Sequence, residues 1–267
     1  MFFKAKDWVT AGNAVCGLAS IVCAIERLPY WASVLICVGW LFDTMDGVVA
    51  RLTKTYNQFG GEFDNLCDHL TYGLAPGFVI YCVYREWFQV QLELPLFTAQ
   101  LLASAAGFVL PLTGTIRGAR LAVKPIKVPG FWIGLPRPVT AFIMVSGLNA
   151  SFFGLWPTLT GSLLLGLIVV MGAMNLGGVP FLSHHGHVWP RYVNWILVIV
   201  VVTIALTALL GPLAHLVYRP LIPQETFFDV FFFWLFGYLL FQWHGVPAAD
   251  WQRAREAVAV WRALPEP

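Results

Sequence analysis

About eight stretches of this chain are long and apolar enough to cross a lipid bilayer as helices. They cover approximately residues 8–26, 31–52, 62–84, 97–122, 136–154, 159–177, 193–211 and 226–243. Hydrophobic residues make up 58% of the 267 residues and charged residues only 11%, whereas a soluble domain carries about 25% charged residues. A bilayer core requires about 20 apolar residues per helix. We therefore predict an all-α, polytopic membrane protein with about eight transmembrane helices, and not a barrel of shorter strands.

Lysine and arginine residues are divided unevenly between the two predicted sides of the membrane. Of the 16 in the chain, all except Arg27, Arg85 and Arg219 fall on one side. Because cytoplasmic loops carry the excess of Lys and Arg, both termini are predicted to be cytoplasmic, in a cell (inner) membrane. The net charge of +2 does not indicate a nucleic-acid partner, and membrane lipids are the expected surroundings.

Four aspartates interrupt the apolar pattern of the second and third predicted spans. They are Asp43, Asp46, Asp64 and Asp68. An aspartate near the middle of a membrane helix costs about 2.5–3.5 kcal/mol. The alternative, ion pairing at helix ends, is disfavoured because Arg51 and Lys54 are too few to neutralise four carboxylates. We therefore predict bound cations here and, through them, an anionic substrate.

The second and third spans form a predicted antiparallel hairpin that turns near residues 55–56. Counted from Thr55, Asp46 and Asp64 are each nine residues away, and Asp43 and Asp68 are twelve and thirteen residues away. The carboxylates are thus expected to lie level in two pairs, the first about 14 Å from the turn. Carboxylate and phosphate oxygens are ligands for hard divalent ions, so the predicted cofactors are two divalent cations, Mg²⁺ or Mn²⁺.

Small residues accompany the aspartates on the same helix faces. Gly47 and Ala50 share a face with Asp43 at helical spacing, and Gly60 precedes Asp64 by one turn. They leave room for a bulky ligand against the backbone. Arg51 can bind a phosphate through two parallel hydrogen bonds.

These residues resemble the signature of the CDP-alcohol phosphotransferase family. The pattern is Asp43, two residues, Asp46-Gly47, two residues, Ala50-Arg51, eight residues, Gly60, three residues, Asp64, three residues, Asp68. The resemblance covers a six-helix catalytic core at about 7–180 of a single membrane domain, 1–267. Two additional helices at 190–245 lie outside it. The resemblance implies that an alcohol hydroxyl attacks the phosphorus of a CDP-linked donor, that CMP leaves, and that the protein is a homodimer.

The resemblance also implies roles for individual residues. Asp43, Asp46, Asp64 and Asp68 would bind the two cations, and Asp68 would accept the hydroxyl proton as the catalytic base. Gly47, Ala50, Arg51 and Gly60 would border the CDP moiety together with Thr10 and Asn13, which match a Thr-x-x-Asn in the first span of related enzymes. The chemistry is consistent, because phosphoryl transfer needs positioning and charge neutralisation more than covalent groups.

Segments flanking the signature resemble the phosphatidylserine synthase branch of the family. The segment from His69 to Pro76 is similar to its x-x-Ser-Phe-Gly-x-Ala-Pro, with Thr71-Tyr72 in place of Ser-Phe. The segment 134–138 is similar to its Gly-Leu-Pro-x-Pro, and 117–120 to its Arg-Leu-Ala-Arg, with glycine in place of leucine. This implies transfer of the phosphatidyl group of CDP-diacylglycerol to L-serine. Sister enzymes that use choline, inositol phosphate or glycerol phosphate are the first alternative, and a membrane transporter is a more distant one.

Three residues outside the signature are candidates for the acceptor side. Arg117 and Arg120, one turn apart at a helix end, can bind the serine carboxylate or the lipid phosphate, or can act as topology anchors. His69, beside the proposed base, can contact the acceptor or pack between helices. The histidines at 184, 185 and 187 are predicted to lie in a solvated loop and not at a transition-metal site.

The C-terminal segment 249–267 is predicted to form a short helix on the cytoplasmic membrane surface, with a disordered tail as the alternative. Five apolar residues lie near one face of this helix. They are Trp251, Ala254, Val258, Trp261 and Leu264.

Overall fold

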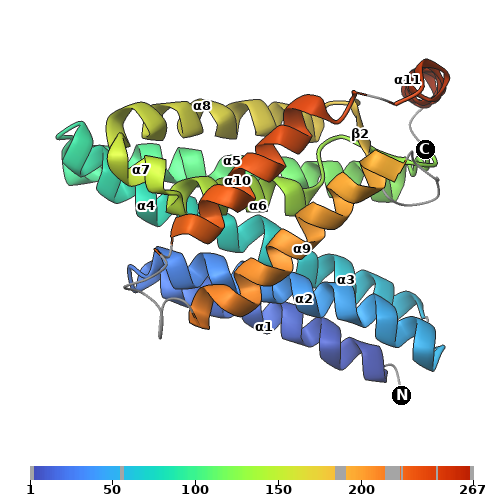
Figure 1. Cartoon of the computed structure of the whole chain (residues 1–267), viewed down its shortest axis with the longest axis horizontal. Helices are drawn as coiled ribbons and strands as arrows, with labels where there is room; N and C mark the ends of the chain where they lie inside the picture. Colours follow the sequence, from blue (N-terminus) through green and yellow to red (C-terminus); the bar gives the residue numbers. More distant parts are fainter. Residues whose placement is uncertain are drawn as a thin grey trace.

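The structure is a computed structural model that describes residues 3–54, 57–183, 191–213, 223, 225–244 and 246–264 of the chain. These residues form a bundle of helices with one small two-stranded sheet (Figure 1), so the predicted all-α class is confirmed. The histidines at 184, 185 and 187 lie outside the described residues. The elements are α1 (Ala5–Ile25), α2 (Pro29–Thr53), α3 (Gln58–His69), the π-helical η1 (Leu70–Leu74), α4 (Ala75–Gln91), α5 (Leu96–Val123), β1 (Phe131–Ile133), α6 (Arg137–Asn149), α7 (Ser151–Leu155), α8 (Pro157–Leu176), β2 (Pro180–Leu182), α9 (Arg191–Leu213), α10 (Glu225–Phe241) and α11 (Ala248–Ala263).

Four of the described helices, α1, α2, α5 and α8, have the length and apolar composition needed to cross a membrane. The span predicted at 193–211 corresponds to α9, a helix of 23 residues, whereas the spans predicted at 136–154 and 226–243 correspond to helices that are interrupted or shorter. The span predicted at 136–154 is divided between α6 and α7 by the extended backbone of Ala150. Helix α10 has 17 residues. The membrane character is therefore supported, whereas the total of eight spans and the cytoplasmic position of the termini stay predictions.

The third predicted span belongs to a longer helical rod that runs through α3, η1 and α4. Its middle is a π-helical turn, in which the backbone N–H of Ala75 donates to the carbonyl of Leu70, five residues earlier. Pro76 follows directly. Proline has no N–H to donate, and its ring crowds the carbonyl four residues before it, so the wider turn accommodates it without ending the rod.

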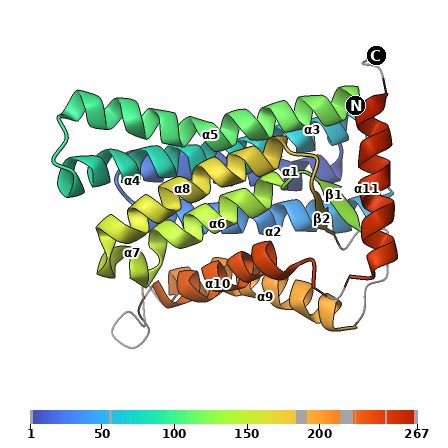
Figure 2. The ribbon, with the colours of Figure 1, turned by 90° about the horizontal axis from the view of Figure 1, so that it is seen from above.

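Helix α6 occupies the centre of the bundle, and its residues 140–148 are all buried. The ring of Phe142 contacts Tyr72 of η1 and Phe231 of α10, with ring centroids 5.8 and 5.3 Å apart. Helices α9 and α10, which follow the predicted six-helix core, pack against α2 and α6 respectively. They lie together along one side of the bundle (Figure 2).

One end of the bundle carries a two-stranded sheet that the sequence analysis did not predict. Strands β1 and β2 pair antiparallel, with Phe131 opposite Leu182. Helix α11 lies across this end (Figure 2) and buries Ala254 and Val258 in a cluster with the two strands and α10, and Trp261 of the same helix is also buried. The predicted C-terminal helix is therefore present, but this part of its apolar face packs on protein. Contact of α11 with a membrane surface stays a prediction.

Candidate active site

The four aspartates lie on two neighbouring helices, Asp43 and Asp46 on α2 and Asp64 and Asp68 on α3. Carboxylate oxygens of Asp43, Asp64 and Asp68 all lie within 4.8 Å of one another. Asp46 is only 8% exposed and its carboxylate lies beside that of Asp64. Helix α2 ends at Thr53 and α3 begins at Gln58, so the turn has the position expected from the sequence. The carboxylates therefore meet as the hairpin count predicts.

Helix α1 supplies hydrogen-bond donors to these carboxylates. Thr10 Oγ1 donates to Asp46 Oδ2 at 2.5 Å, and Asn13 Nδ2 donates to Asp68 Oδ1 at 3.1 Å. Both α1 side chains are fully buried, and they are three residues apart on the face that meets α2 and α3. Thr10 and Asn13 thus orient carboxylates in this structure, and their predicted contact with CDP stays a prediction.

Tyr72 is a further donor that the sequence analysis did not single out. It lies in η1, is 1% exposed, and its hydroxyl donates to Asp43 Oδ2 at 3.2 Å. The signal was available, because tyrosine stands here where the phosphatidylserine synthase branch has phenylalanine. Three of the four aspartates therefore each accept a hydrogen bond from a neutral side chain of another element.

The cluster has the chemistry of a site for a hard divalent cation. Asp64 Oδ1 and Asn13 Oδ1 are buried and, within the described part of the chain, accept no hydrogen bond. Unpaired buried oxygens are costly, and a cation at the carboxylates would compensate Asp64. Asp43, Asp64 and Asp68 can therefore hold a metal ion. Participation of Asp46, and a second ion, stay proposals.

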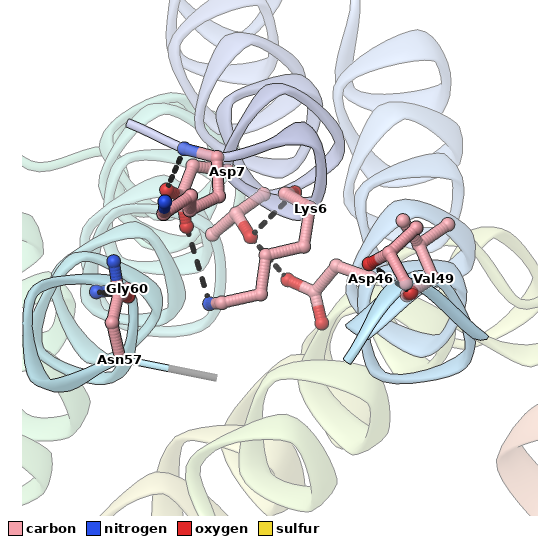
Figure 3. A network of polar contacts seen from close by, with 9 residues as sticks. Lys6, Asp7, Asp46, Val49, Asn57 and Gly60 are labelled. Atoms are coloured by element: carbon pink, nitrogen blue, oxygen red, sulfur yellow. Dashed lines mark hydrogen bonds and ion pairs between the residues drawn. The ribbon is translucent and has the colours of Figure 1, made fainter. Parts of the chain in front are cut away.

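The small residues of the signature differ in their surroundings. A Cβ at Gly47 would meet only Arg51 Nη1, at 3.9 Å, so α2 is open there, and Arg51 itself is exposed. Ala50 is buried. Gly60 is covered by the side chain of Lys6 from α1 (Figure 3), which the sequence analysis counted only as a positive charge on the cytoplasmic side.

Comparison with known proteins assigns this arrangement to a family. The model of the CDP-alcohol phosphatidyltransferase family matches residues 5–202, which include all four aspartates and their α1 donors. The chain belongs to this family of enzymes. The match ends within α9, so α10 and α11 lie beyond it.

Relatives from distant organisms are similar to half or more of this chain. A CDP-diacylglycerol–serine O-phosphatidyltransferase of Methanocaldococcus jannaschii is 31% identical over 140 residues, 52% of this chain and 58% of that protein. Proteins of the same name from Helicobacter pylori and Mycobacterium tuberculosis are 32% and 28% identical over 174 and 208 residues. These matches cover 64% and 76% of this chain, and 69% and 70% of the relatives.

Two arginines, Arg117 of α5 and Arg137 of α6, form what we call the cationic end of the site. Arg117 Nε donates to the carbonyl of Ile133 at 3.0 Å, and Arg137 Nη2 donates to Asn65 Oδ1 at 2.5 Å. Arg137 lies within electrostatic range of both Arg117 and Asp68. The sequence analysis counted Arg137 only as a topology charge, although the Gly-Leu-Pro-x-Pro segment contains it. Arg137 therefore lies beside the carboxylate cluster, with Arg117 next to it.

Arg120, predicted to act beside Arg117, is held in a different way. Its Nη1 and Nη2 donate to the carbonyls of Leu176 and Gly177 at 2.7 and 3.4 Å. The guanidinium carbon lies 5.2 Å from the centre of the Trp261 ring. Arg120 therefore links the ends of α5, α8 and α11, and its predicted roles in substrate binding or as a topology anchor stay predictions.

His69 contacts α5 and none of the aspartates. Its Nε2 lies 3.0 Å from Thr115 Oγ1, whose hydroxyl donates to the carbonyl of Pro111. Because that hydroxyl proton is committed, Nε2 carries the proton of the imidazole and donates to Thr115. This geometry matches the packing alternative for His69, and a contact with the acceptor stays a prediction.

Proposed function

We propose that this protein transfers the phosphatidyl group of CDP-diacylglycerol to the hydroxyl of L-serine and releases CMP. The observation that carries the proposal is the convergence of Asp43, Asp64 and Asp68 within 4.8 Å, on the signature of a family of CDP-alcohol transferases. The names of these relatives, serine O-phosphatidyltransferases, support serine as the acceptor. The chain spans 58% of the length of the M. jannaschii relative, so the identities of the donor and the acceptor are proposals and are not taken directly from that relative.

In the proposed reaction the serine hydroxyl oxygen forms a bond to the phosphorus that carries diacylglycerol. The bond from this phosphorus to the bridging oxygen of the diphosphate breaks, and that oxygen leaves as part of CMP. Two divalent cations, Mg²⁺ or Mn²⁺, held by Asp43, Asp46, Asp64 and Asp68, would neutralise the charge of the diphosphate. Asp68 accepts the hydroxyl proton. Asn13 fixes one oxygen of Asp68, which leaves the other free to act as the base.

Arg117 and Arg137 are proposed to bind the carboxylate of serine. Among the described residues, neither forms an ion pair with a carboxylate, although both lie near Asp68 or near each other. A guanidinium can donate two parallel hydrogen bonds to a carboxylate. A serine held in this way would present its hydroxyl toward Asp68. Arg120 is not assigned to substrate, because two backbone carbonyls and Trp261 already engage it.

We further propose that the site opens to the cytoplasmic face of the cell membrane and that the protein is a homodimer. The excess of Lys and Arg on the hairpin-turn side supports the first point, and family membership supports the second. The alternative of a transporter is disfavoured, because the four signature aspartates lie on α2 and α3 and are not distributed over both halves of the chain.

The test measures CMP release from CDP-diacylglycerol by the purified protein, with Mg²⁺ or Mn²⁺, in four parallel reactions. The acceptors are serine, choline, inositol phosphate and glycerol phosphate. Release with serine alone is expected. Release with another acceptor would replace serine while retaining the reaction, and no release with any of them would refute the proposed function. In the same assay, Arg117→Lys is expected to raise the KM for serine and to leave the KM for CDP-diacylglycerol unchanged within about twofold.

A further inference from the structure

Lys6 is a buried cation on the face of α1 that carries the hydrogen-bond donors to the aspartates. Its side chain is 8% exposed, and its Nζ lies 3.2 Å from Oδ1 of the fully buried Asp7. The other oxygen of Asp7 accepts the backbone N–H of Lys4 at 2.6 Å. Lys6 precedes Thr10 and Asn13 by four and seven residues, so the three share one face of α1. Figure 3 shows the Lys6 side chain extending across this face between Asp7 and Asp46.

The Lys6 ammonium lies against the backbone of Gly60. A methyl group at Gly60 would collide with Nζ and Cε of Lys6, so the side chain fills the space that glycine leaves. Gly60 stands one helical turn before Asp64, and the backbone N–H of Gly60 is already bonded to the Asn57 side chain at 2.7 Å. Lys6 also lies within electrostatic range of Asp64. A buried cation therefore borders the carboxylate cluster on the side of the hairpin turn.

The position along α3 indicates which part of the donor this cation would meet. If the diphosphate is held at the aspartates, the two acyl chains of CDP-diacylglycerol must extend into the bilayer. The cytidine must then extend the opposite way, toward the hairpin turn between α2 and α3. Gly47 follows Asp46 by one residue, and Gly60 precedes Asp64 by one turn. Both glycines therefore lie on the hairpin-turn side of the aspartates. Lys6 is the single basic residue of α1, and its side chain is buried against this region.

We propose that Lys6 is a donor-specificity residue, whose ammonium leaves the backbone of Gly60 when the donor binds and donates hydrogen bonds to the acceptor atoms of the cytidine. The ribose oxygens and the O2 and N3 atoms of cytosine are such acceptors. This inference rests on the proposed function. It adds a contact outside the eight-residue signature, and it assigns Asp7 the role of holding Lys6 in place until the donor arrives.

The experiment measures binding of CMP and of inorganic pyrophosphate to the purified full-length protein, in the presence of Mn²⁺, by isothermal titration. Lys6→Met retains the length of the side chain and removes the charge. Because this variant leaves Asp7 buried without its partner, the double variant Lys6→Met/Asp7→Asn is measured as well, with Asp7→Asn as its reference. Lys4→Met, which removes an exposed lysine from the same helix end, is the matched control.

Loss of Lys6 is expected to weaken CMP binding about tenfold in both the single and the double variant, because a charge-assisted hydrogen bond is lost. Pyrophosphate binding and the Lys4→Met control should stay within about twofold of wild type. In turnover, the KM for CDP-diacylglycerol should rise and that for serine should not. CMP affinity within twofold of wild type, or equal loss for CMP and pyrophosphate, would overturn the proposal and leave Lys6 as a counter-ion of the carboxylates. Wild-type protein that binds no CMP would instead refute the proposed function.

Discussion

Replacement of Gly134 by alanine tests how the cationic end of the site is built. Gly134 follows β1 and has φ +73°, in the left-handed region that residues with a Cβ rarely adopt. Its backbone N–H donates to the carbonyl of Val179 at 2.9 Å. A Cβ at this position would lie 2.7 Å from the carbonyl oxygen of Asn175, and 3.0 Å from both the carbonyl oxygen of Gly177 and Nε of Arg117. The turn thus has neither the conformation nor the space for a side chain.

The cost of Gly134→Ala has two parts. The left-handed conformation costs about 1–2 kcal/mol for a residue with a Cβ. Overpacking against backbone atoms, which cannot rotate away, adds about 1–3 kcal/mol. The sum is about 2–5 kcal/mol, a large part of the stability of a typical domain. If the turn shifts to relieve the contact, Arg117 must move with it, so the KM for serine should rise more than the KM for CDP-diacylglycerol.

The measurements are the resistance of the purified protein to thermal unfolding in detergent, and the two KM values from CMP release. Gly118→Ala is the matched control, since a Cβ at Gly118 in α5 meets no atom within 4 Å. Alanine is favoured over glycine inside a helix by about 0.5–1 kcal/mol, so this control should be unchanged or slightly more stable. A Gly134→Ala protein as stable as wild type, with an unchanged KM for serine, would refute the account of this turn.

Two further substitutions address the carboxylates. Asp68→Asn keeps an oxygen for the Asn13 side chain but cannot accept the hydroxyl proton. The kcat should therefore fall by about 10²–10⁴-fold, while binding of CDP-diacylglycerol stays within about tenfold. An equal loss of donor binding would contradict the assignment of Asp68 as the base. Tyr72→Phe removes the donor to Asp43 and should weaken Mn²⁺ binding, followed by electron paramagnetic resonance, about tenfold or more. Tyr84→Phe, which removes a buried hydroxyl bonded to the carbonyl of Gly161, should leave the Mn²⁺ affinity unchanged. Equal Mn²⁺ affinities of the wild type, Tyr72→Phe and Tyr84→Phe would show that Tyr72 has no role at the site.

The carboxylate cluster could be predicted from the sequence because it depends on local geometry. Helical periodicity places Asp43 and Asp46 on one face and Asp64 and Asp68 on another, and a short turn between two helices leaves little freedom in how these faces meet. The same periodicity places Lys6, Thr10 and Asn13 on one face of α1. It did not show that Thr10 and Asn13 would bond to the aspartates, because that depends on the rotation of α1 about its axis.

Features that depend on contacts between distant segments could not be predicted. Strands β1 and β2 have three residues each and are separated by α6, α7 and α8, so neither shows an alternating pattern long enough to recognise. Beyond its charge and its place in the Gly-Leu-Pro-x-Pro segment, Arg137 carried no signal until its contact with Asn65 of α3 was known. The apolar face of α11 was recognised, but hydrophobicity does not distinguish a surface covered by lipid from one covered by protein.

Helix α11 also has a consequence for the order in which the protein is assembled. The side chain of Trp261 donates to the carbonyl of Lys124, which lies 137 residues earlier in the chain. At typical rates of synthesis, about 7–27 s separate the appearance of these two residues. During that interval the signature helices can pack and the aspartates can meet, while Arg120 lacks its aromatic partner. A newly made chain would therefore complete its carboxylate cluster before Trp261 joins Arg120 and the end of α5.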